Sequence, residues 1–512
     1  MLHQTIVILD FGSQFTQLIA RRVREFGVYC EIRACTDKAP TSRATNLLGV
    51  VLSGGPASVL SEDAPPFDAA WIGLGVPVLG VCYGMQWLAQ HHEGTVRSGR
   101  SREYGAAAIG LEPNAGLLFS DFAAERPHTV WMSHGDHVDV VPSGWRVLAR
   151  SEGVIAAMCS QDNRLTGIQF HPEVTHSVQG KDLLRRFVVD QCGAAGDWTP
   201  GSFVEESVAA LRAQLGDDHV VCGLSGGVDS AVVAALLFRA IGPRLHCIFV
   251  DNGLLRLGEA ESVRTEFADF GVVVVDAQAQ FLEGLAGVAD PERKRKIIGE
   301  LFIRVFEREA RALGPTTRWL AQGTLYPDVI ESISVRGPSA TIKSHHNVGG
   351  LPERMDLRLV EPLRELFKDE VRAVGVVLGL SDARVWRQPF PGPGLAVRCL
   401  GEVSASRLDV LSRADAIVRE EIAAAGWERK IWQSFCVLLP VRTVGVMGDE
   451  RSYEEVAVIR AVHSTDGMTA DWVQLPYDLL GRMSGRIINE VRGINRVAYD
   501  ISNKPPATIE WE

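Results

Sequence analysis

Cys82 stands where an apolar run meets a helical pattern, and its neighbours are those of a reactive turn. The stretch VPVLGVCYGMQWLAQ (76–90) places one glycine two residues before Cys82 and another two residues after it. In such a G-x-C-x-G pattern the glycines relieve crowding around a strained strand-to-helix turn that lifts the nucleophile off the sheet. A thiol at a helix N-terminus is also favoured as the thiolate. The pattern predicts a nucleophile; a small buried core cysteine is the alternative.

A second segment supplies the base that a nucleophilic cysteine needs. LTGIQFHPEV (165–174) is expected to be a strand that ends in His171, Pro172 and Glu173. Residues i and i+2 of an extended segment point the same way, so Glu173 can orient His171. Nucleophile, base and orienting acceptor together make a catalytic triad. Alone, a His-Pro-Glu stretch is more typical of a surface loop, so the triad prediction depends on Cys82 as well.

A glycine-rich loop opens another helix in CGLSGGVDSAVVAALL (222–237), but it lacks the G-x-x-x-x-G-K-[ST] pattern of the common phosphate loop. Backbone N–H groups at a helix start bind anions, and glycines let a phosphate come close. The hydroxyls of Ser225 and Ser230 add donors. Asp229 would repel a phosphate unless a cation lies between them, so it predicts Mg²⁺ bridging carboxylate and phosphate oxygens. An ordinary glycine turn capped by Asp or Ser is the alternative.

Short β-rich runs alternate with helical patterns around both motifs, a rhythm typical of α/β domains with mostly parallel sheets. The expected strands of the first part are 5–12, 29–35, 49–55, 76–82, 154–160 and 165–170, and those of the second part are 219–225, 245–253, 271–277 and 317–324. The last part combines a helical stretch, 404–426, with short strands in 435–447. In an open parallel sheet, ligands bind at the carboxyl ends of the strands, so the motifs can converge there.

The predicted fold class is therefore α/β: two successive domains with mostly parallel sheets, followed by a smaller α+β C-terminal domain. The stretches CGAAGDWTPGS (192–202) and RQPFPGPGLAVR (387–398) are rich in glycine or proline and indicate the boundaries. The predicted domains are 1–192, 193–388 and 389–512.

Composition narrows the possible partners and the compartment. The net charge of −11 gives no overall basic footprint for nucleic acid. Nine cysteines without paired metal-ligand spacing, and no leader-like pattern at the start, predict reduced thiols in a cytoplasmic protein. No apolar run reaches about 18 residues, so we expect no membrane partner.

The first part resembles the class I glutamine amidotransferases over roughly residues 1 to 192. The resemblance rests on the G-x-C-x-G turn, the His-Pro-Glu stretch and the loop Ser53-Gly54-Gly55-Pro56. It implies the triad Cys82, His171 and Glu173. It also implies further residues for the oxyanion and for the glutamine substrate: Gly54, Gly55, Tyr83, Gln86, Ser133, His134 and Gly135.

The second part resembles the N-type ATP pyrophosphatases, which cleave ATP between the α and β phosphates and adenylate a substrate. The resemblance rests on the Ser-Gly-Gly-Val-Asp-Ser loop and on FVDNGLLR (249–256). The implied ATP and pyrophosphate residues are Ser225, Gly226, Gly227, Val228, Asp229, Ser230, Val250, Gly323, Lys343 and Lys368, with Asp229 as the metal ligand. An exposed lysine is the alternative for both lysines, and neighbouring His345 and His346 have poor spacing for a shared metal.

Along its whole length the chain resembles the GMP synthetase family, because of the order of its parts and of C-terminal segments such as YDISNKPPATIEWE (499–512). The resemblance implies that glutamine, ATP and xanthosine 5′-monophosphate (XMP) are the substrates, that Mg²⁺ accompanies ATP without a tightly bound organic cofactor, and that the third domain makes a homodimer. The implied XMP residues are Arg295, Lys504, Ile509 and Glu510.

Two positions depart from the pattern of the GMP synthetase family. Gln388 stands where histidine is expected, and Met447 stands where some members carry glutamine. The C-terminal tail also leaves a choice: fraying is common at termini, but Ile509 and Trp511 are spaced as on a short strand with one buried face.

Two other functions compete with this interpretation. One is another glutamine-fed adenylating enzyme, such as an NAD synthetase-like protein, against which the C-terminal KPPATIEWE stretch argues. The other is a catalytically silent nucleotide-binding scaffold, against which the intact Cys82, His171, Glu173 and Asp229 argue.

Overall fold

The computed structural model describes residues 3–42, 44–123, 126–333, 357–447, 450–464 and 469–512. Two compact units are distinguished, one built mainly from residues before 204 and the other mainly from the residues that follow.

The first unit is a nine-stranded sheet in the order β2-β1-β3-β4-β9-β8-β7-β5-β6. The strands are β1 (Thr5–Asp10), β2 (Tyr29–Ala34), β3 (Leu47–Leu52), β4 (Val78–Val81), β5 (Thr95–Leu111), β6 (His128–Val140), β7 (Arg146–Ser151), β8 (Val154–Cys159) and β9 (Leu165–Ile168). The pairs from β2 to β9 are parallel and those from β9 to β6 are antiparallel. The parallel part carries the sequence motifs.

Three helices accompany this sheet: α1 (Thr16–Glu25), α2 (Tyr83–His91) and α3 (Gly180–Arg185). In α1 the buried Ile19, Ala20 and Val23 recur at helical spacing, so one stripe faces the protein. The strand β4 is buried at all four residues, as expected for a central parallel strand. Burial on both faces makes β4 a rigid support for the turn that follows it.

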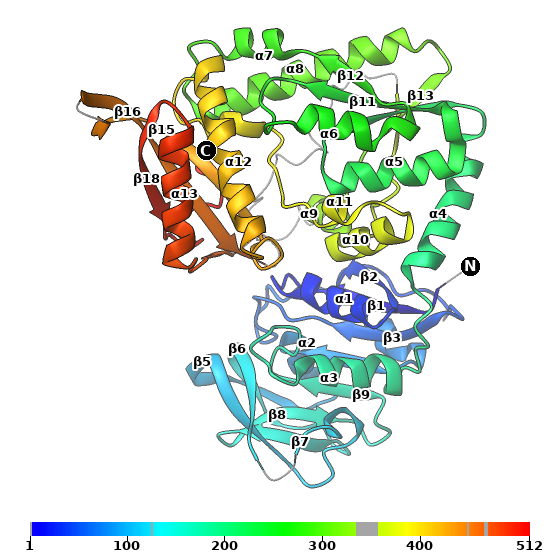
Figure 1. Ribbon diagram of the computed structural model, residues 1–512. Helices are drawn as coiled ribbons and strands as arrows, with labels where there is room; N and C mark the ends of the chain where they lie inside the picture. The colour runs from blue at the N-terminus through cyan, green and yellow to red at the C-terminus, as the bar shows by residue number, and fades with distance from the viewer. Residues whose placement is uncertain (1–2, 43, 124–125, 334–356, 448–449, 465–468) are drawn as a thin grey trace. The chain divides into compact units, whose positions relative to one another are not determined.

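The second unit begins with a five-stranded, wholly parallel sheet in the order β12-β11-β10-β13-β14. Its strands are β10 (His219–Leu224), β11 (Leu245–Asp251), β12 (Val273–Asp276), β13 (Thr317–Ala321) and β14 (Arg358–Val360). Its helices are α4 (Pro200–Leu215), α5 (Val228–Ile241), α6 (Glu259–Glu266), α7 (Gln278–Leu285), α8 (Pro291–Ala312), α9 (Tyr326–Ile333), α10 (Lys368–Val377) and α11 (Asp382–Val385). Figure 1 shows the sheet between α7 and α8 on one side and α5 and α6 on the other.

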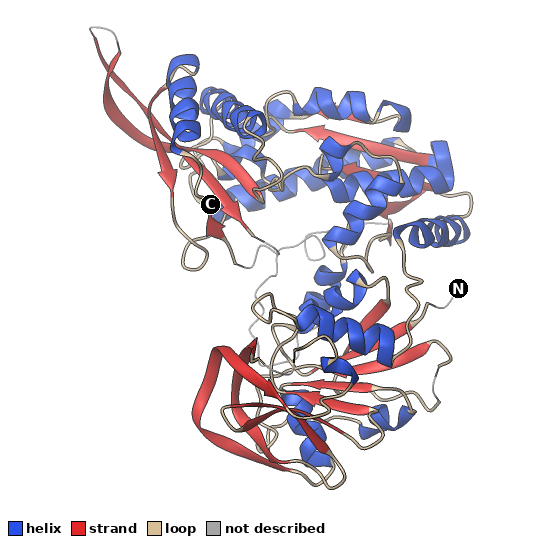
Figure 2. Ribbon diagram, turned by 60° about the horizontal axis from the view of Figure 1, so that its bottom comes forward, coloured by secondary structure: helices blue, strands red, loops and turns tan. Residues whose placement is uncertain are grey.

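The last part of the chain adds a smaller sheet of β15 (Gln433–Met447), β16 (Glu450–His463), β17 (Asp471–Trp472) and β18 (Ile494–Asp500), with helices α12 (Ala405–Ala424) and α13 (Tyr477–Glu490). β16 pairs antiparallel with β15 and parallel with β18. Figure 2 shows β15 and β16 as a long two-stranded arm. One buried core runs from Val221 and Ile248 of the parallel sheet to Leu438 and Ile459 of the smaller one. The second and third parts of the chain therefore pack as one body.

The predicted fold class is confirmed: mostly parallel sheets are followed by a smaller α+β part. The sequence analysis did not predict the long strands β5 and β6, because charged and polar residues interrupt the alternation that marks a half-buried strand. The expected short strands of 435–447 belong to one strand of 15 residues, whose pairing with β16 shifts register between Leu439 and Arg442. Among the described residues, no helix has the length and apolar character needed to cross a bilayer.

Candidate active sites

Cys82 lies on a strained turn between β4 and α2. Its backbone has φ 51° and ψ −103°, a conformation that costs energy for any residue with a Cβ. A Cβ added at Gly80 would lie 2.6 Å from the carbonyl oxygen of Gly84, and one added at Gly84 would collide with the Leu52 carbonyl. Both positions of the G-x-C-x-G pattern therefore require glycine, and the packing of α2 on β3 and β4 imposes the turn.

His171 lies after β9, the strand next to β4, and is 3% exposed. Its Nδ1 is 2.7 Å from Oε1 of Glu173, which is also buried. A Cβ added at Gly54 would lie 3.1 Å from Cε1 of His171 and 3.7 Å from Cβ of Cys82, so the imidazole and the thiol share one small space. The structure thus brings the three predicted triad residues together.

The electrostatics of this buried group favour the imidazolium form of His171. Burial lowers the pKa of His171, but the Glu173 carboxylate and the Cys82 side chain outweigh burial and raise the pKa to about 10. An opposite charge within hydrogen-bond distance is the usual cause of such a shift. At neutral pH the imidazole therefore holds a proton that it can give to a leaving group.

The predicted oxyanion loop lies beside the thiol. The Ser53 hydroxyl accepts a hydrogen bond from the N–H of Phe11 at 3.0 Å, which fixes the loop to the end of β1. A Cβ added at Gly55 would lie 2.7 Å from the Phe11 carbonyl oxygen, so glycine is required there. Tyr83 is the first residue of α2, and the first N–H groups of a helix have no partner within the helix. These N–H groups can serve as oxyanion donors.

The predicted glutamine residues border the same space. Cys82 Sγ is 3.7 Å from the carbonyl oxygen of Ser133, which lies on β6. Gln86 donates to the carbonyl oxygen of Asp136 at 2.8 Å. The His134 imidazole lies 3.0 Å from that same oxygen and 3.0 Å from the Glu103 carboxylate. Gly135 lies between these residues on β6.

Sequence reasoning missed Gln169. Its amide nitrogen lies 3.5 Å from Cys82 Sγ, and its amide oxygen accepts from Gln86 at 3.3 Å. The signal was present in the sequence, because Gln169 precedes His171 by two residues in one expected extended segment, where residues i and i+2 point the same way. Gln169 links the nucleophile to the predicted substrate-binding residue.

The second site is the turn between β10 and α5. The hydroxyls of Ser225 and Ser230 lie 3.1 Å apart, and that of Ser230 also accepts from the N–H of Ser225 at 3.1 Å. Gly226 has φ +74°, a conformation that favours glycine, and Val228 begins the helix. The N–H of Gly227 donates to the Ser225 hydroxyl at 3.3 Å. The loop is thus ordered by its own side chains, with a helix start beneath it.

The side chain of Asp229 is held by Lys368, the first residue of α10. Lys368 Nζ lies 2.7 Å and 2.5 Å from the two carboxylate oxygens. Gly323, at the end of β13, would place a Cβ 3.3 Å from Cβ of Asp229. The sequence analysis assigned Lys368 to pyrophosphate; in the structure it neutralises Asp229 in the same place. Three predicted residues from distant segments therefore meet at the loop.

The donor set at this loop agrees with Mg²⁺ carried in by ATP. The described residues contain no group of three His, Cys, Asp or Glu side chains that could hold a metal. Mg²⁺ usually binds through one or two carboxylates with substrate phosphates and water, so the single carboxylate of Asp229 suffices. Val250 is 4% exposed near the carboxyl end of β11, the strand next to β10. Lys343, His345 and His346 lie outside the described residues.

The C-terminal tail is anchored instead of frayed. Ile509 is 8% exposed and packs with the apolar residues of β15 and β16. Glu510 accepts from Arg398 at 2.8 and 3.0 Å and from Gln433 at 2.8 Å. The backbone of Lys504 pairs with that of Ala470. The expectation of a short strand around Ile509 and Trp511 is wrong, because residues 505–512 form no strand and these charged contacts hold the tail.

Arg295 donates to the backbone oxygen of Glu512, which links α8 to the same tail. Gln433 was missed by the sequence analysis, because nothing in its local sequence marks it as a partner of Glu510. Gln388, the first departure, accepts from both the N–H and the hydroxyl of Ser434 at 2.9 Å. The Met447 side chain, the second departure, lies outside the described side chains. Gln388 therefore fastens the proline-rich stretch to β15.

Three family models match successive parts of the chain. A model of the class I glutamine amidotransferases matches residues 7–191, a model of the NAD synthases matches 202–251, and a model of the GMP synthase C-terminal domain matches 420–511. The glutamine-hydrolysing GMP synthase of Solidesulfovibrio magneticus is 58% identical over 512 residues, with 99% of each chain covered. That of Thiobacillus denitrificans is 56% identical, with all of each chain covered.

The chain belongs to the glutamine-hydrolysing GMP synthase family. The NAD synthase match covers only residues 202–251, from α4 to β11, whereas the Solidesulfovibrio magneticus relative covers 99% of the chain, so the NAD synthetase-like alternative is set aside. Among solved structures, a glutamine amidotransferase of Thermotoga maritima is similar, with 19% identity and a TM-score of 0.32, over 38% of this chain and all of that chain.

Proposed function

We propose that the chain makes GMP from XMP by two chemistries, glutamine hydrolysis and adenylation, in separate parts of one polypeptide. The observation that carries the proposal is the presence of both a Cys82–His171–Glu173 arrangement and an ordered Ser-Gly-Gly-Val-Asp-Ser loop. Ammonia released by the first part is the nucleophile that the second part consumes.

In the first half, the Cys82 sulfur attacks the amide carbon of glutamine, bound by Gln86 and residues 133–135. Charge that develops on the amide oxygen is stabilised by the N–H groups of Gly54, Gly55 and Tyr83. His171 carries a proton at neutral pH because of its raised pKa, and it gives this proton to the amide nitrogen, which then leaves as ammonia. Water then hydrolyses the thioester, with His171 as the base, and glutamate leaves.

In the second half, the C2 oxygen of XMP attacks the α-phosphorus of ATP and pyrophosphate departs. Loop N–H groups, the hydroxyls of Ser225 and Ser230, and Lys343 and Lys368 hold the pyrophosphate, while Val250 borders the adenosine. When bound to Asp229, Mg²⁺ supplies further charge neutralisation for the phosphates. Ammonia then displaces AMP from the adenylated base and GMP results.

XMP is held by the tail and by α8. Lys504 and Arg295 are suited to its phosphate as cations, and Ile509 packs beside the base. Glu510, oriented by Arg398 and Gln433, accepts from purine N–H groups. This assignment is supported by the anchoring of the tail, because a preformed pocket costs less entropy on binding.

The long β15–β16 arm is the proposed homodimer surface. Val444 and Tyr453 are directly opposite each other, and they are 51% and 58% exposed. Val446, two residues further along β15, is 76% exposed. Exposed apolar side chains that adjoin on one face of a sheet favour association.

Two further expectations concern the setting of the enzyme. The nine cysteines are all buried and are thiols, not disulfides, which favours a reducing compartment such as the cytoplasm. We also expect only small-molecule substrates, with no nucleic acid, no membrane and no tightly bound organic cofactor as partners.

The proposal is tested by measuring all products with purified enzyme. With XMP, ATP, Mg²⁺ and glutamine, we expect GMP, AMP, pyrophosphate and glutamate in equal amounts. The matched control replaces XMP by the acid acceptor of an NAD synthetase, which should give no pyrophosphate. Pyrophosphate released with that acceptor but not with XMP would contradict the proposal.

A further inference from the structure

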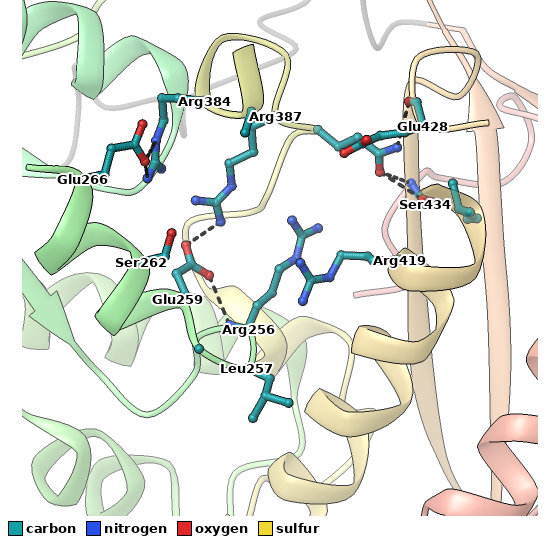
Figure 3. Close-up of a pocket in the computed structure, with 14 residues that line it drawn as sticks. Arg256, Leu257, Glu259, Ser262, Glu266, Arg384, Arg387, Arg419, Glu428 and Ser434 are labelled. Carbon is teal, nitrogen blue, oxygen red and sulfur yellow. Dashed lines mark hydrogen bonds and ion pairs between the residues drawn. The ribbon is translucent and has the colours of Figure 1, made fainter. Parts of the chain in front are cut away.

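A pocket of about 250 Å³ lies beside the glycine loop, on the side of the Gly226 carbonyl. Figure 3 shows the guanidinium groups of Arg256, Arg387 and Arg419 extending toward its middle. Ser434 borders it from β15, whereas the neighbouring Gln433 donates to Glu510 of the XMP residues. Successive strand residues point to opposite faces, so this pocket and the XMP residues lie on opposite faces of β15.

Two of the pocket arginines have their charges matched by carboxylates. Arg384 forms an ion pair with Glu266, and Arg387 forms one with Glu259 at 2.5 Å. Both arginines also donate to the carbonyl oxygen of Gly226, at 2.5 and 2.6 Å. They therefore hold the glycine loop from its carbonyl side, and their charge is already matched.

The other two arginines share one carboxylate. Arg256 and Arg419 lie 3.5 and 3.2 Å from Asp415, which is fully buried. Arg398 lies 3.8 Å from that same carboxylate and is itself fully buried. Glu428 also borders the pocket, but it is exposed. One buried carboxylate is thus shared by both guanidinium groups.

Arg256 is buried with its hydrogen-bonding capacity only partly used. It is only 6% exposed, and among the residues that the structure describes neither its Nε nor its Nη2 has a hydrogen-bond partner. Its guanidinium stacks on the Phe390 ring at 4.5 Å, which leaves the edges of the group available. Burial and the nearby arginines lower the pKa of Arg256 to about 10, although Asp415 acts in the opposite direction. A buried charge without hydrogen bonds is costly, and an anion in the pocket would remove the cost.

We propose that this pocket is a binding site for a phosphate-type anion, held by Arg256 and Arg419 and distinct from the ATP and XMP sites. Guanidinium groups bind phosphate oxygens in a bidentate manner, and two converging groups suit one tetrahedral dianion. The anion is either free inorganic phosphate or the phosphate group of a nucleotide. Arg384 and Arg387 border the site but stay with the glycine loop.

The test is calorimetric titration of the full chain with inorganic phosphate, after XMP and a non-hydrolysable ATP analogue have filled the reaction sites. We expect one phosphate per chain. Arg419→Gln should weaken phosphate binding by about 10- to 150-fold, the equivalent of one charge-assisted hydrogen bond. Arg413→Gln is the matched control, because Arg413 pairs with Asp409 on the same helix at the same spacing, 3.2 Å away.

Two further arms complete the experiment. Titration with a nucleoside monophosphate in place of phosphate identifies the source: tighter binding than phosphate, and equal sensitivity to Arg419→Gln, would assign the site to a nucleotide. Arg256→Met should abolish binding of either ligand; if that variant does not fold, the Arg419 and Arg413 pair decides. Absence of phosphate and nucleotide binding to the wild-type chain, or equal binding by Arg419→Gln and Arg413→Gln, would overturn the proposal.

Discussion

Lys368 holds both carboxylate oxygens of Asp229, at 2.7 and 2.5 Å, although 139 residues separate them in the chain. The pair lies at the start of α5, where the proposed Mg²⁺ and pyrophosphate bind. Lysine and metal compete for the same carboxylate. We therefore expect Lys368 to turn from Asp229 to the phosphates when Mg²⁺ and ATP bind.

This competition gives opposite expectations for two variants. Asp229→Asn should raise the Mg²⁺ concentration for half-maximal synthesis by about 10-fold or more, since the metal loses a charged ligand. Lys368→Met should not raise that concentration, but should raise the KM for ATP. Mg²⁺ titrations with ammonium as nitrogen source measure both effects. Equal Mg²⁺ dependence of Asp229→Asn and wild type would exclude Asp229 as the ligand.

The ion pair of His171 and Glu173 predicts a loss of stability at alkaline pH. The pKa of His171 is about 10 in the folded chain and near 6.5 when unfolded, so folding takes up a proton between these values. The stabilisation is complete below about pH 6.5 and is lost as the pH rises through 10.

Glu173→Gln removes the group that raises the pKa of His171. Denaturant unfolding at pH 7 and pH 10 should show a smaller loss of stability over this range in Glu173→Gln than in wild type. The same loss in both proteins would mean that His171 is not protonated in the folded state.

The turn at Cys82 predicts a contrast between two glycines of the first unit. Gly84→Ala would bring a Cβ against the Leu52 carbonyl, whereas a Cβ at Gly73 meets nothing within 4 Å. We expect Gly84→Ala to lose most glutamine hydrolysis, because the Cys82 turn must shift, and Gly73→Ala to retain it. Glutamate release measures the difference, and ammonium-dependent synthesis by both variants shows that the second unit is intact. Normal hydrolysis by Gly84→Ala would mean that the turn tolerates a side chain.

The tail prediction is tested best with a single substitution. Deleting residues 504–512 would leave the fully buried Lys294 without Glu512, a loss of the kind that costs about 3–5 kcal/mol. Lys504→Ala leaves that pair in place and should weaken XMP binding by about 10- to 150-fold. Lys430→Ala, an exposed lysine over the Trp427 ring, is the control. Steady-state kinetics with XMP as the varied substrate should give a higher KM for Lys504→Ala than for Lys430→Ala. Equal KM values for XMP would mean that Lys504 does not bind XMP.

Local sequence was enough to predict the turn at Cys82 and the glycine loop at 225–230. Each is a continuous motif in which the backbone conformation or the packing requires glycine. Gly84 leaves no room for a Cβ beside the Leu52 carbonyl, and Gly226 has φ +74°, so the motifs themselves carry the conformational requirement. The fold class could also be predicted from local sequence, because the buried parallel strands are continuous apolar runs.

What could not be predicted depends on contacts between distant residues. Two examples are the contacts of Lys368 with Asp229 and of Gln433 with Glu510. Each joins segments that are far apart in the sequence, and no periodic pattern in the sequence connects them. The β5 strand was missed because it is exposed and polar along much of its length, so no apolar alternation marks it. The tail is held by ion pairs to Lys294 and Arg398, not by a strand, and such pairs have no sequence signature.

The central claim is that one chain joins a cysteine glutaminase to an ATP-dependent synthetase, and Cys82→Ala tests it most directly. GMP formation by this variant is measured twice, once with glutamine and once with an ammonium salt at a pH where free ammonia is present. We predict no GMP with glutamine and synthesis near the wild-type rate with ammonium. A folded Cys82→Ala protein that still uses glutamine, or that fails with ammonium, would contradict the account.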